Sequence, residues 1–319
     1  MKSISIFVVC VCLLMLTCSN TTQNTVESVE SVAVDSLEDD TLSVEELPLP
    51  VVPTALVEPE ARASYVIAHF WDAMDFGDIV RSHSSAFMEQ NFVNFVSVFP
   101  YADEESRRSA VSSLLGMAAV DAGAYRLLSS IAEDYLYDPN SPMFDEETYI
   151  LFLESMVRSS ILDEAHITRL NYQLRFARLN RPGMRASDFS YVMSNGKQSR
   201  LHKTDTANRL LLVFYDPDCD HCKEVMAELK VSSLIAELVA GGSIRVLAIY
   251  ADGDKDLWES TCMELPDSWT VGMDTKGEIY ERGLYSLRAL PSIYLLDKDK
   301  TVILKDVSLN SLFDYLESM

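Results

Sequence analysis

The sequence predicts an α+β protein of two domains, in which an all-α helical domain precedes an α/β domain with a central mixed sheet flanked by helices. Between residues 62 and 180, apolar residues recur at the spacing of amphipathic helices. After Pro182 and Gly183, short apolar runs typical of buried strands alternate with helical patterns. The length of 319 residues allows about two domains of ordinary size.

The first residues have the pattern of an export signal. Lys2 precedes an apolar run over residues 4–16, which is too short to span a bilayer and suits a signal-peptide core. The residues up to Cys18 resemble a lipoprotein signal, although Thr17 stands where that signal usually has Gly, Ala or Ser. We therefore expect residues 1–18 to direct export, with Cys18 as the lipidated first residue of a periplasm-facing envelope protein. Plain cleavage near this point is the alternative.

Residues 19–60 carry many acidic residues, no lysine or arginine, and several prolines toward their end. Such a segment repels itself and buries little apolar surface, so we expect a disordered tether that provides reach. An acidic docking motif is the alternative. The net charge of −23 argues against nucleic acid as a partner and against adsorption to anionic lipid through a basic face.

The all-helical domain is expected over residues 61–181. Its candidate helices cover residues 61–74, 84–98, 104–121, 121–136, 145–159 and 163–179. His69 and Asp72 share one helix face, which would permit a metal ligand pair, but capping and surface charge explain such acids equally well. We expect no metal here, and we interpret aromatic residues such as Phe70 and Trp71 as core, with a peptide groove as the alternative.

The α/β domain is expected over residues 182–319. Strands are predicted at 188–193, 197–202, 210–215, 244–250, 269–273, 292–296 and 301–304, and helical segments at 222–240, 254–263, 276–283 and 309–316. The run over 244–250 is continuously apolar, as in a strand buried on both faces of a parallel sheet.

Two cysteines lie where the strand over 210–215 gives way to a helix. Cys219 and Cys222 are three residues apart, and the first turn of a helix brings such positions to one side, where the thiols can close into a disulfide. The helix N-terminus stabilises a thiolate on the first cysteine. Cys219 is therefore the predicted nucleophile and Cys222 the resolving thiol. A zinc knuckle would need a second ligand pair, for which Cys262 and His202 are only loose candidates.

At these residues the chain from Gly183 to Met319 resembles a thioredoxin-fold domain of the TlpA/ResA thiol:disulfide oxidoreductase type. The resemblance rests on Ala186-Ser187-Asp188-Phe189, on the cysteine pair after a strand, and on Leu290-Pro291 before a late strand. It implies that Pro291 is cis, lies against the dithiol and, with Leu290, helps to present backbone to a bound thiol partner. The preceding helices resemble a domain of unknown function found in lipoproteins of Bacteroidetes-type bacteria.

The charged residues around the cysteines have opposite effects on the reduction potential of the Cys219–Cys222 couple. A protonated His221 would stabilise the Cys219 thiolate, whereas Asp220 and two further acids of this loop, Asp216 and Asp218, repel it. Pro217 forms part of the turn that leads to the dithiol. Because the acids outnumber the histidine and the related proteins are mostly reductants, we favour a reductant or isomerase over an oxidant.

The chain departs from the related proteins at two positions. Their tryptophan before the dithiol is replaced by Tyr215 and Asp216, and their buried glutamate three residues after the second cysteine is Val225. Glu224 would point about 100° away around the helix and is expected at the surface. Cys262 is expected to be a buried apolar side chain.

The predicted function is therefore envelope thiol:disulfide exchange without a cofactor. Its partners would be cysteine-containing envelope proteins and a membrane electron donor. The alternative is a non-catalytic lipoprotein that binds a peptide or partner and keeps a vestigial dithiol. The retained pair Cys219 and Cys222 favours the enzyme, whereas the missing glutamate and tryptophan favour the binding protein. A peroxidase fits less well, since the proline and threonine that precede a peroxidatic cysteine are absent.

Overall fold

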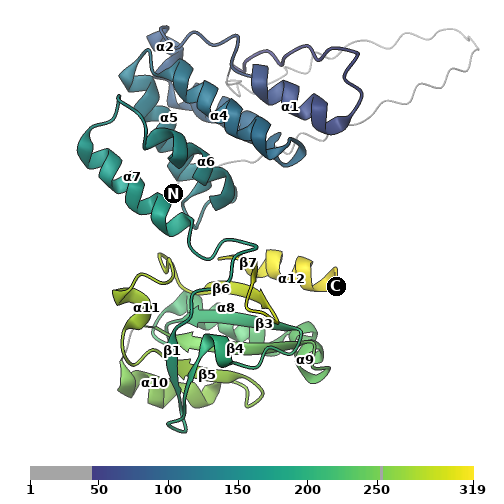
Figure 1. The fold of residues 1–319 in the computed structure, drawn as a ribbon, viewed down its shortest axis with the longest axis vertical. Helices are drawn as coiled ribbons and strands as arrows, with labels where there is room; N and C mark the ends of the chain where they lie inside the picture. The colour runs from purple at the N-terminus through teal and green to yellow at the C-terminus, as the bar shows by residue number, and fades with distance from the viewer. Residues whose placement is uncertain (1–44, 252–253) are drawn as a thin grey trace, which may run out of the picture. The chain divides into compact units, whose positions relative to one another are not determined.

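The computed structural model describes residues 45–251 and 254–319 (Figure 1). The expected signal peptide, the lipidation site Cys18 and the tether as far as residue 44 lie outside the described residues. Over the described ranges, no helix has the length and apolar character needed to cross a membrane.

The segment from Glu45 to Glu58 corrects the expected end of the tether at residue 60. Leu47 is buried, and its N–H donates a hydrogen bond of 2.8 Å to the side chain of Asn91, which is itself fully buried. The Asn91 amide also donates to the carbonyl oxygens of Phe87 and Glu45. A buried amide needs such partners, and backbone groups supply them without leaving a pattern in the sequence.

The all-helical domain is confirmed. It consists of α1 (Pro59–His69), α2 (Ile79–Ser82), α3 (Ser85–Val96), a 3₁₀ turn (Phe99–Tyr101), α4 (Glu104–Ala118), α5 (Ala122–Leu136), α6 (Glu146–Met156) and α7 (Glu164–Ala177). Asp103, Asp121, Asp145 and Asp163 each cap the helix that follows by accepting a backbone N–H. The sequence missed α2 because four residues are too few to show a helical period.

Phe70 and Trp71 lie in the core of this domain, as expected, and each is 2% exposed. Phe95 contacts both of their rings, and Phe92 packs on Phe152 of α6. These aromatic side chains join the residues just after α1 to α3 and α6 in one interior cluster. They are therefore not available as a surface groove.

The second domain is a seven-stranded mixed sheet with the order β2-β1-β5-β4-β3-β6-β7. Its strands are β1 (Ser190–Met193), β2 (Gln198–Arg200), β3 (Arg209–Tyr215), β4 (Ile244–Tyr250), β5 (Thr270–Met273), β6 (Ser292–Asp297) and β7 (Val302–Leu304). The central strand β3 runs parallel to β4 and antiparallel to β6. The expected central mixed sheet is thereby confirmed.

Helices cover the sheet, and this explains the continuous apolar runs of β3 and β4 (Figure 1). These helices are α8 (Asp220–Val231), α9 (Ser233–Ala240), α10 (Lys255–Thr261), α11 (Glu278–Glu281) and α12 (Leu309–Glu317), with short 3₁₀ turns at Leu201–Lys203 and Cys262–Glu264. Leu211 and Val213 of β3 pack in one core with α8 and α12, whereas Leu212 and Phe214 pack in a second core on the opposite face.

Candidate active site

Both cysteines lie at the start of α8, which follows β3 after a short turn. Cys219 is the N-cap residue of α8, and its Sγ accepts the backbone N–H of Cys222 at 3.4 Å. The backbone N–H of Asp216 points at the Sγ of Cys222, also at 3.4 Å. Both thiols are free. The two cysteines therefore lie together, with the first sulfur at the positive end of a helix, where a thiolate is stabilised.

The two sulfurs differ in accessibility. Cys219 is partly buried, whereas Cys222 is only 1% exposed. Burial is the largest of the causes that raise the pKa of Cys222 to about 12, and the Cys219 sulfur and the Asp216 carboxylate add to it. The Asp216 backbone N–H acts in the opposite direction. Cys222 is therefore held as a thiol, and Cys219 is the sulfur that an incoming group can reach.

Leu290 and Pro291 lie beside the dithiol. The peptide bond between them is cis, as the resemblance implied. The Cys219 Sγ lies 3.9 Å from the carbonyl oxygen of Leu290, and Ser292, which begins β6, pairs with Phe214 at the end of β3. Within the described ranges, the N–H of Leu290 donates no hydrogen bond. One backbone group next to the nucleophile is therefore open to a ligand.

The charged residues between the cysteines face solvent. The side chain of His221 is 68% exposed and lies 3.7 Å from Glu224, and that of Asp220 is 97% exposed and lies 3.2 Å from Lys223. Solvent screens such pairs strongly. Pro217 is partly buried in the turn, where the N–H of the following residue, Asp218, donates to the Asp216 carboxylate at 2.8 Å.

The structure separates Asp216 from the other acids of this loop. Val225 is 8% exposed in the core, and Glu224, with a side chain that is 80% exposed, does not take the place of the missing glutamate. Asp216 differs because its own backbone N–H is bonded to Cys222 and its carboxylate raises the pKa of that thiol. Sequence reasoning treated Asp216 as one of three equivalent acids. Its position just after the strand was the signal that set it apart.

The remaining candidate residues, Cys262, His202 and His69, have ordinary packing or hydrogen-bond contacts. Cys262 is buried, as expected, and contacts the Glu259 carbonyl oxygen at 3.8 Å. His202 contacts the carbonyl oxygen of Ala186 at 2.7 Å, and His69 contacts Asp72 at 2.7 Å at an exposed position. Across the part of the chain that the structure describes, no group of three or more potential metal ligands is assembled.

Sequence reasoning missed a cleft of about 480 Å³ that borders the dithiol. His221, Leu290 and Pro291 line it from the redox site. Residues 139–142 and 144–147 of the helical domain line it too, and we call residues 139–147 the wall segment. No sequence pattern connects these stretches, so the cleft could not be found before the fold.

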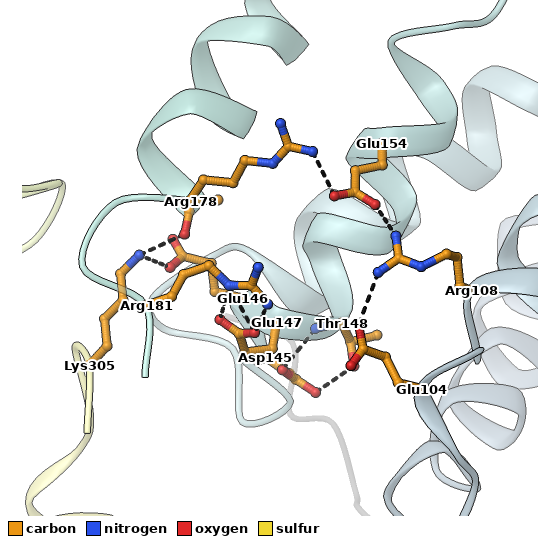
Figure 2. Close-up of polar contacts among 11 residues, drawn as sticks. Glu104, Arg108, Asp145, Glu146, Glu147, Thr148, Glu154, Arg178, Arg181 and Lys305 are labelled. Carbon is orange, nitrogen blue, oxygen red and sulfur yellow. Dashed lines mark hydrogen bonds and ion pairs between the residues drawn. The ribbon is translucent and has the colours of Figure 1, made fainter. Parts of the chain in front are cut away.

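A buried group of charges at the base of this cleft was also missed. Lys305 forms an ion pair with Glu146, and their side chains are 6% and 8% exposed (Figure 2). Arg288 lies 3.6 Å from Glu146, and the Ser292 hydroxyl donates to Asp306 at 2.6 Å. Burial raises the pKa of both carboxyl groups, Glu146 and Asp306, against the opposing effect of the two cations. We call these four charged residues the anchor cluster (Glu146, Arg288, Lys305 and Asp306).

The sheet, the dithiol at the start of α8 and the adjacent cis-proline define a thioredoxin-like domain that follows a helical domain. Comparison with known proteins agrees. A family model described as a domain of unknown function, DUF5106, matches residues 17–180. The crystal structure of a thioredoxin-like protein from Bacteroides caccae has 35% sequence identity and a TM-score of 0.80, over 86% of this chain and 99% of its own.

Two structures from Bacteroides fragilis match over 43% of this chain and 98% of their own. One is the C-terminal domain of an uncharacterized protein, with 37% identity and a TM-score of 0.42. The other is a conserved protein of unknown function, with 42% identity and a TM-score of 0.41. No curated protein matches. The chain therefore belongs to the DUF5106 family, and its C-terminal domain is thioredoxin-like.

Proposed function

We propose that this protein is a thiol:disulfide oxidoreductase of the cell envelope. One observation carries the proposal. The partly buried sulfur of Cys219 caps α8, accepts the N–H of the buried Cys222, and lies 3.9 Å from the carbonyl oxygen that precedes the cis-proline Pro291. An accessible sulfur at a helix N-terminus with a resolving thiol three residues later is the arrangement that thiol–disulfide exchange requires.

The exchange would proceed in two steps. The Cys219 thiolate attacks one sulfur of a partner's disulfide, a mixed disulfide forms, and the partner's other sulfur leaves as a thiolate and takes up a proton. Cys222 then loses its proton and attacks the Cys219 sulfur. This releases the partner's second thiol, and two electrons have passed to the partner. The Cys219–Cys222 disulfide is afterwards reduced by a membrane electron donor, which completes the cycle.

Asp216 is our candidate for the group that accepts the proton of Cys222. A thiol whose pKa is raised to about 12 needs an acceptor before it can attack at neutral pH. The Asp216 carboxylate acts electrostatically on this thiol, and its position is fixed by the N–H of Asp218. Glu224 is too exposed for this role.

Transfer of electrons toward the partner, as a reductant or isomerase, is the direction that the surroundings favour. An oxidant needs a strongly stabilised thiolate. His221 could supply such stabilisation only from an exposed position, where Glu224 opposes its charge. Asp216, by contrast, acts against the ionisation of Cys222 from within the loop.

We further propose that lipid on Cys18 holds the protein at the membrane, facing the periplasm, and that cysteine-containing envelope proteins are its partners. The motif at Cys18 supports this location. Metabolic labelling with a fatty acid tests it, because the Cys18→Ala variant should remain unlabelled and leave the membrane fraction.

The reduction potential of the Cys219–Cys222 couple tests the proposed activity. Equilibration of the protein in glutathione or dithiothreitol buffers should give a value near that of thioredoxin, about −270 mV, whereas an oxidant would lie near −120 mV. Failure to form a reversible disulfide would favour the alternative, a non-catalytic binding lipoprotein. The apolar Val225 at the position of the related proteins' glutamate supports that alternative.

A further inference from the structure

We propose that the wall segment forms one side of the substrate cleft, and that this cleft binds an extended, cysteine-bearing segment of a partner polypeptide whose neighbouring side chains are neutral or basic. The inference rests on the proposed function. It adds the charge of the side chains that flank the partner's cysteine and gives the helical domain a role in choosing the partner.

The cleft is continuous with the redox site. Leu290 and Pro291 line it, and the carbonyl oxygen of Leu290 is the group that lies 3.9 Å from the Cys219 sulfur. His221, which stands between the two cysteines, lines it as well. A group bound in the cleft therefore lies next to the sulfur that would attack it.

Hydrogen bonds to the end of α5 hold the wall segment in place. The Ser141 hydroxyl donates to the Tyr135 carbonyl oxygen at 2.6 Å, and the Asp145 N–H donates to the Leu136 carbonyl oxygen at 3.1 Å. Pro139 and Pro142 fix two further backbone angles. A preorganised wall loses little conformational entropy when a ligand binds, which is what a recognition surface needs.

The anchor cluster joins this wall to the thioredoxin-like domain. Glu146, in the last part of the wall segment, pairs with Lys305 (Figure 2). The Lys305 ammonium group also donates to the Ala177 carbonyl oxygen at 2.8 Å. Arg288 lies over the ring of Tyr137 at 3.6 Å and donates to its carbonyl oxygen at 2.5 Å.

The cluster also reaches the redox site. Asp306 follows Lys305 in the chain and accepts the hydroxyl of Ser292, the residue next to Pro291. The anchor cluster thereby connects the helical domain to the residues beside the dithiol.

The size and the backbone of the cleft indicate its occupant. A volume of about 480 Å³ is enough for a short segment of a partner chain. The N–H of Leu290, which has no partner among the described residues, can pair with an extended backbone, as in strand addition.

The charge of the cleft indicates which side chains the segment carries. Among the described lining residues, Lys305 is the only lysine or arginine, and Glu146 neutralises it. Asp145 is exposed at the cleft and Asp218 is exposed beside Cys219, and neither has a cation within ion-pair distance in the described ranges. Acidic neighbours of the partner's cysteine would therefore be repelled.

The test compares a peptide with a small disulfide. Two peptides of about ten residues each carry one cysteine as a mixed disulfide with 2-mercaptoethanol, flanked by lysines in one and by glutamates in the other. The reduced full chain should react about tenfold faster with the lysine peptide, and added salt should narrow this difference. The Asn140→Trp variant should slow the lysine peptide about tenfold. Each peptide rate is divided by the same variant's rate with bis(2-hydroxyethyl) disulfide, so that a change at the dithiol itself is not counted as a change in peptide binding.

Asn195→Trp is the matched control, since Asn195 is also an exposed asparagine in a turn, but lies outside the cleft lining. Ser311→Trp, which narrows the cleft from α12, should act like Asn140→Trp.

Equal peptide rates for Asn140→Trp and Asn195→Trp would overturn the role of the wall segment, and equal rates for the two peptides would overturn the assigned charge. A parent chain that reacts with neither disulfide would overturn the proposed function as well, whereas reaction with the small disulfide alone would leave that function standing.

Discussion

The dithiol loop, by which we mean residues 216–224 including the first turn of α8, and the anchor cluster both bring carboxylates and cations together, but they do so in opposite environments. In the loop, the pair of His221 and Glu224 is 68% and 80% exposed, and its residues are three apart in the sequence. In the anchor cluster, the pair of Lys305 and Glu146 is 6% and 8% exposed, and it joins two domains. Exposed pairs contribute little to stability, whereas removing one partner of a buried pair lowers the stability strongly, because an unpaired charge stays buried. Chemistry and stability should therefore be separable by mutation.

The largest effect is expected in the loop, on activity alone. Cys219→Ser should lower the rate of disulfide exchange by about a thousandfold or more, because no other accessible thiol is placed at the helix N-terminus in the described residues. Urea unfolding should show little change in stability. Exchange that survives in this variant, with Cys222 intact, would contradict the assigned nucleophile. Cys222→Ser should instead accumulate the mixed disulfide, which mass spectrometry detects.

The anchor cluster should show the reverse behaviour. Lys305→Met leaves Glu146 buried with only Arg288 as a counter-charge, so the free energy of unfolding should fall by about 3–5 kcal/mol. The matched control is Lys223→Met, which breaks the exposed pair with Asp220 and should change stability by less than about 0.5 kcal/mol. Urea unfolding measures both. Equal losses in the two variants would remove the distinction between the two regions.

The pH dependence of the Lys305→Met variant sharpens this result. Burial raises the pKa of Glu146, and Lys305 opposes that shift, so the variant should have a still higher folded-state pKa. Between the unfolded and folded pKa values the native state binds more protons than the unfolded state, and stability then falls as the pH rises. The loss relative to the parent should therefore be larger at pH 8 than at pH 5. A loss that is independent of pH would assign the effect to packing of the lysine stem.

Asp216→Asn tests the proton acceptor in the dithiol loop, and its expected effect on the exchange reaction is smaller. The Asp216 charge raises the pKa of Cys222, so its removal should lower that pKa and leave more thiolate. If Asp216 accepts the proton, the resolving step should nevertheless slow by about tenfold. Rapid mixing of the variant with a disulfide substrate resolves this step. A faster resolving step would show that Asp216 acts on Cys222 only as a repelling charge. Asp218→Asn, at an exposed neighbour, is the control.

Most of the fold could be predicted because its signals are local. The apolar run of β4, the cysteine spacing and the aspartates that cap α4 to α7 can each be recognised within a few residues. The anchor cluster could not be predicted, since Glu146 and Lys305 look like ordinary surface residues until two domains meet over them. The packing of Leu47 on Asn91 is another case, because it depends on a backbone group.

The candidate site, like the fold, has parts that could be predicted from the sequence and parts that could not. Cys219 and Cys222 follow from spacing, and Pro291 follows from the family resemblance, but the cleft combines residues 139–147 with residues 289–291 and 305–308. Such a combination depends on tertiary contacts alone. The position of Asp216 directly after β3 could have set it apart from Asp218 and Asp220 in the sequence, whereas the bond from its N–H to Cys222 is visible only in the structure.

The smallest expected effect concerns Glu224, which lies next to the position where related proteins carry a buried glutamate. Glu224→Gln should change the exchange rate by less than about twofold and the stability by less than about 0.5 kcal/mol, because an exposed pair with His221 is screened by solvent. The same assay with a small disulfide measures the rate. A tenfold loss would mean that Glu224 turns toward Cys222 when a partner binds. The proton acceptor would then be recruited by the substrate, and the simple division between an exposed loop and a buried anchor would no longer hold.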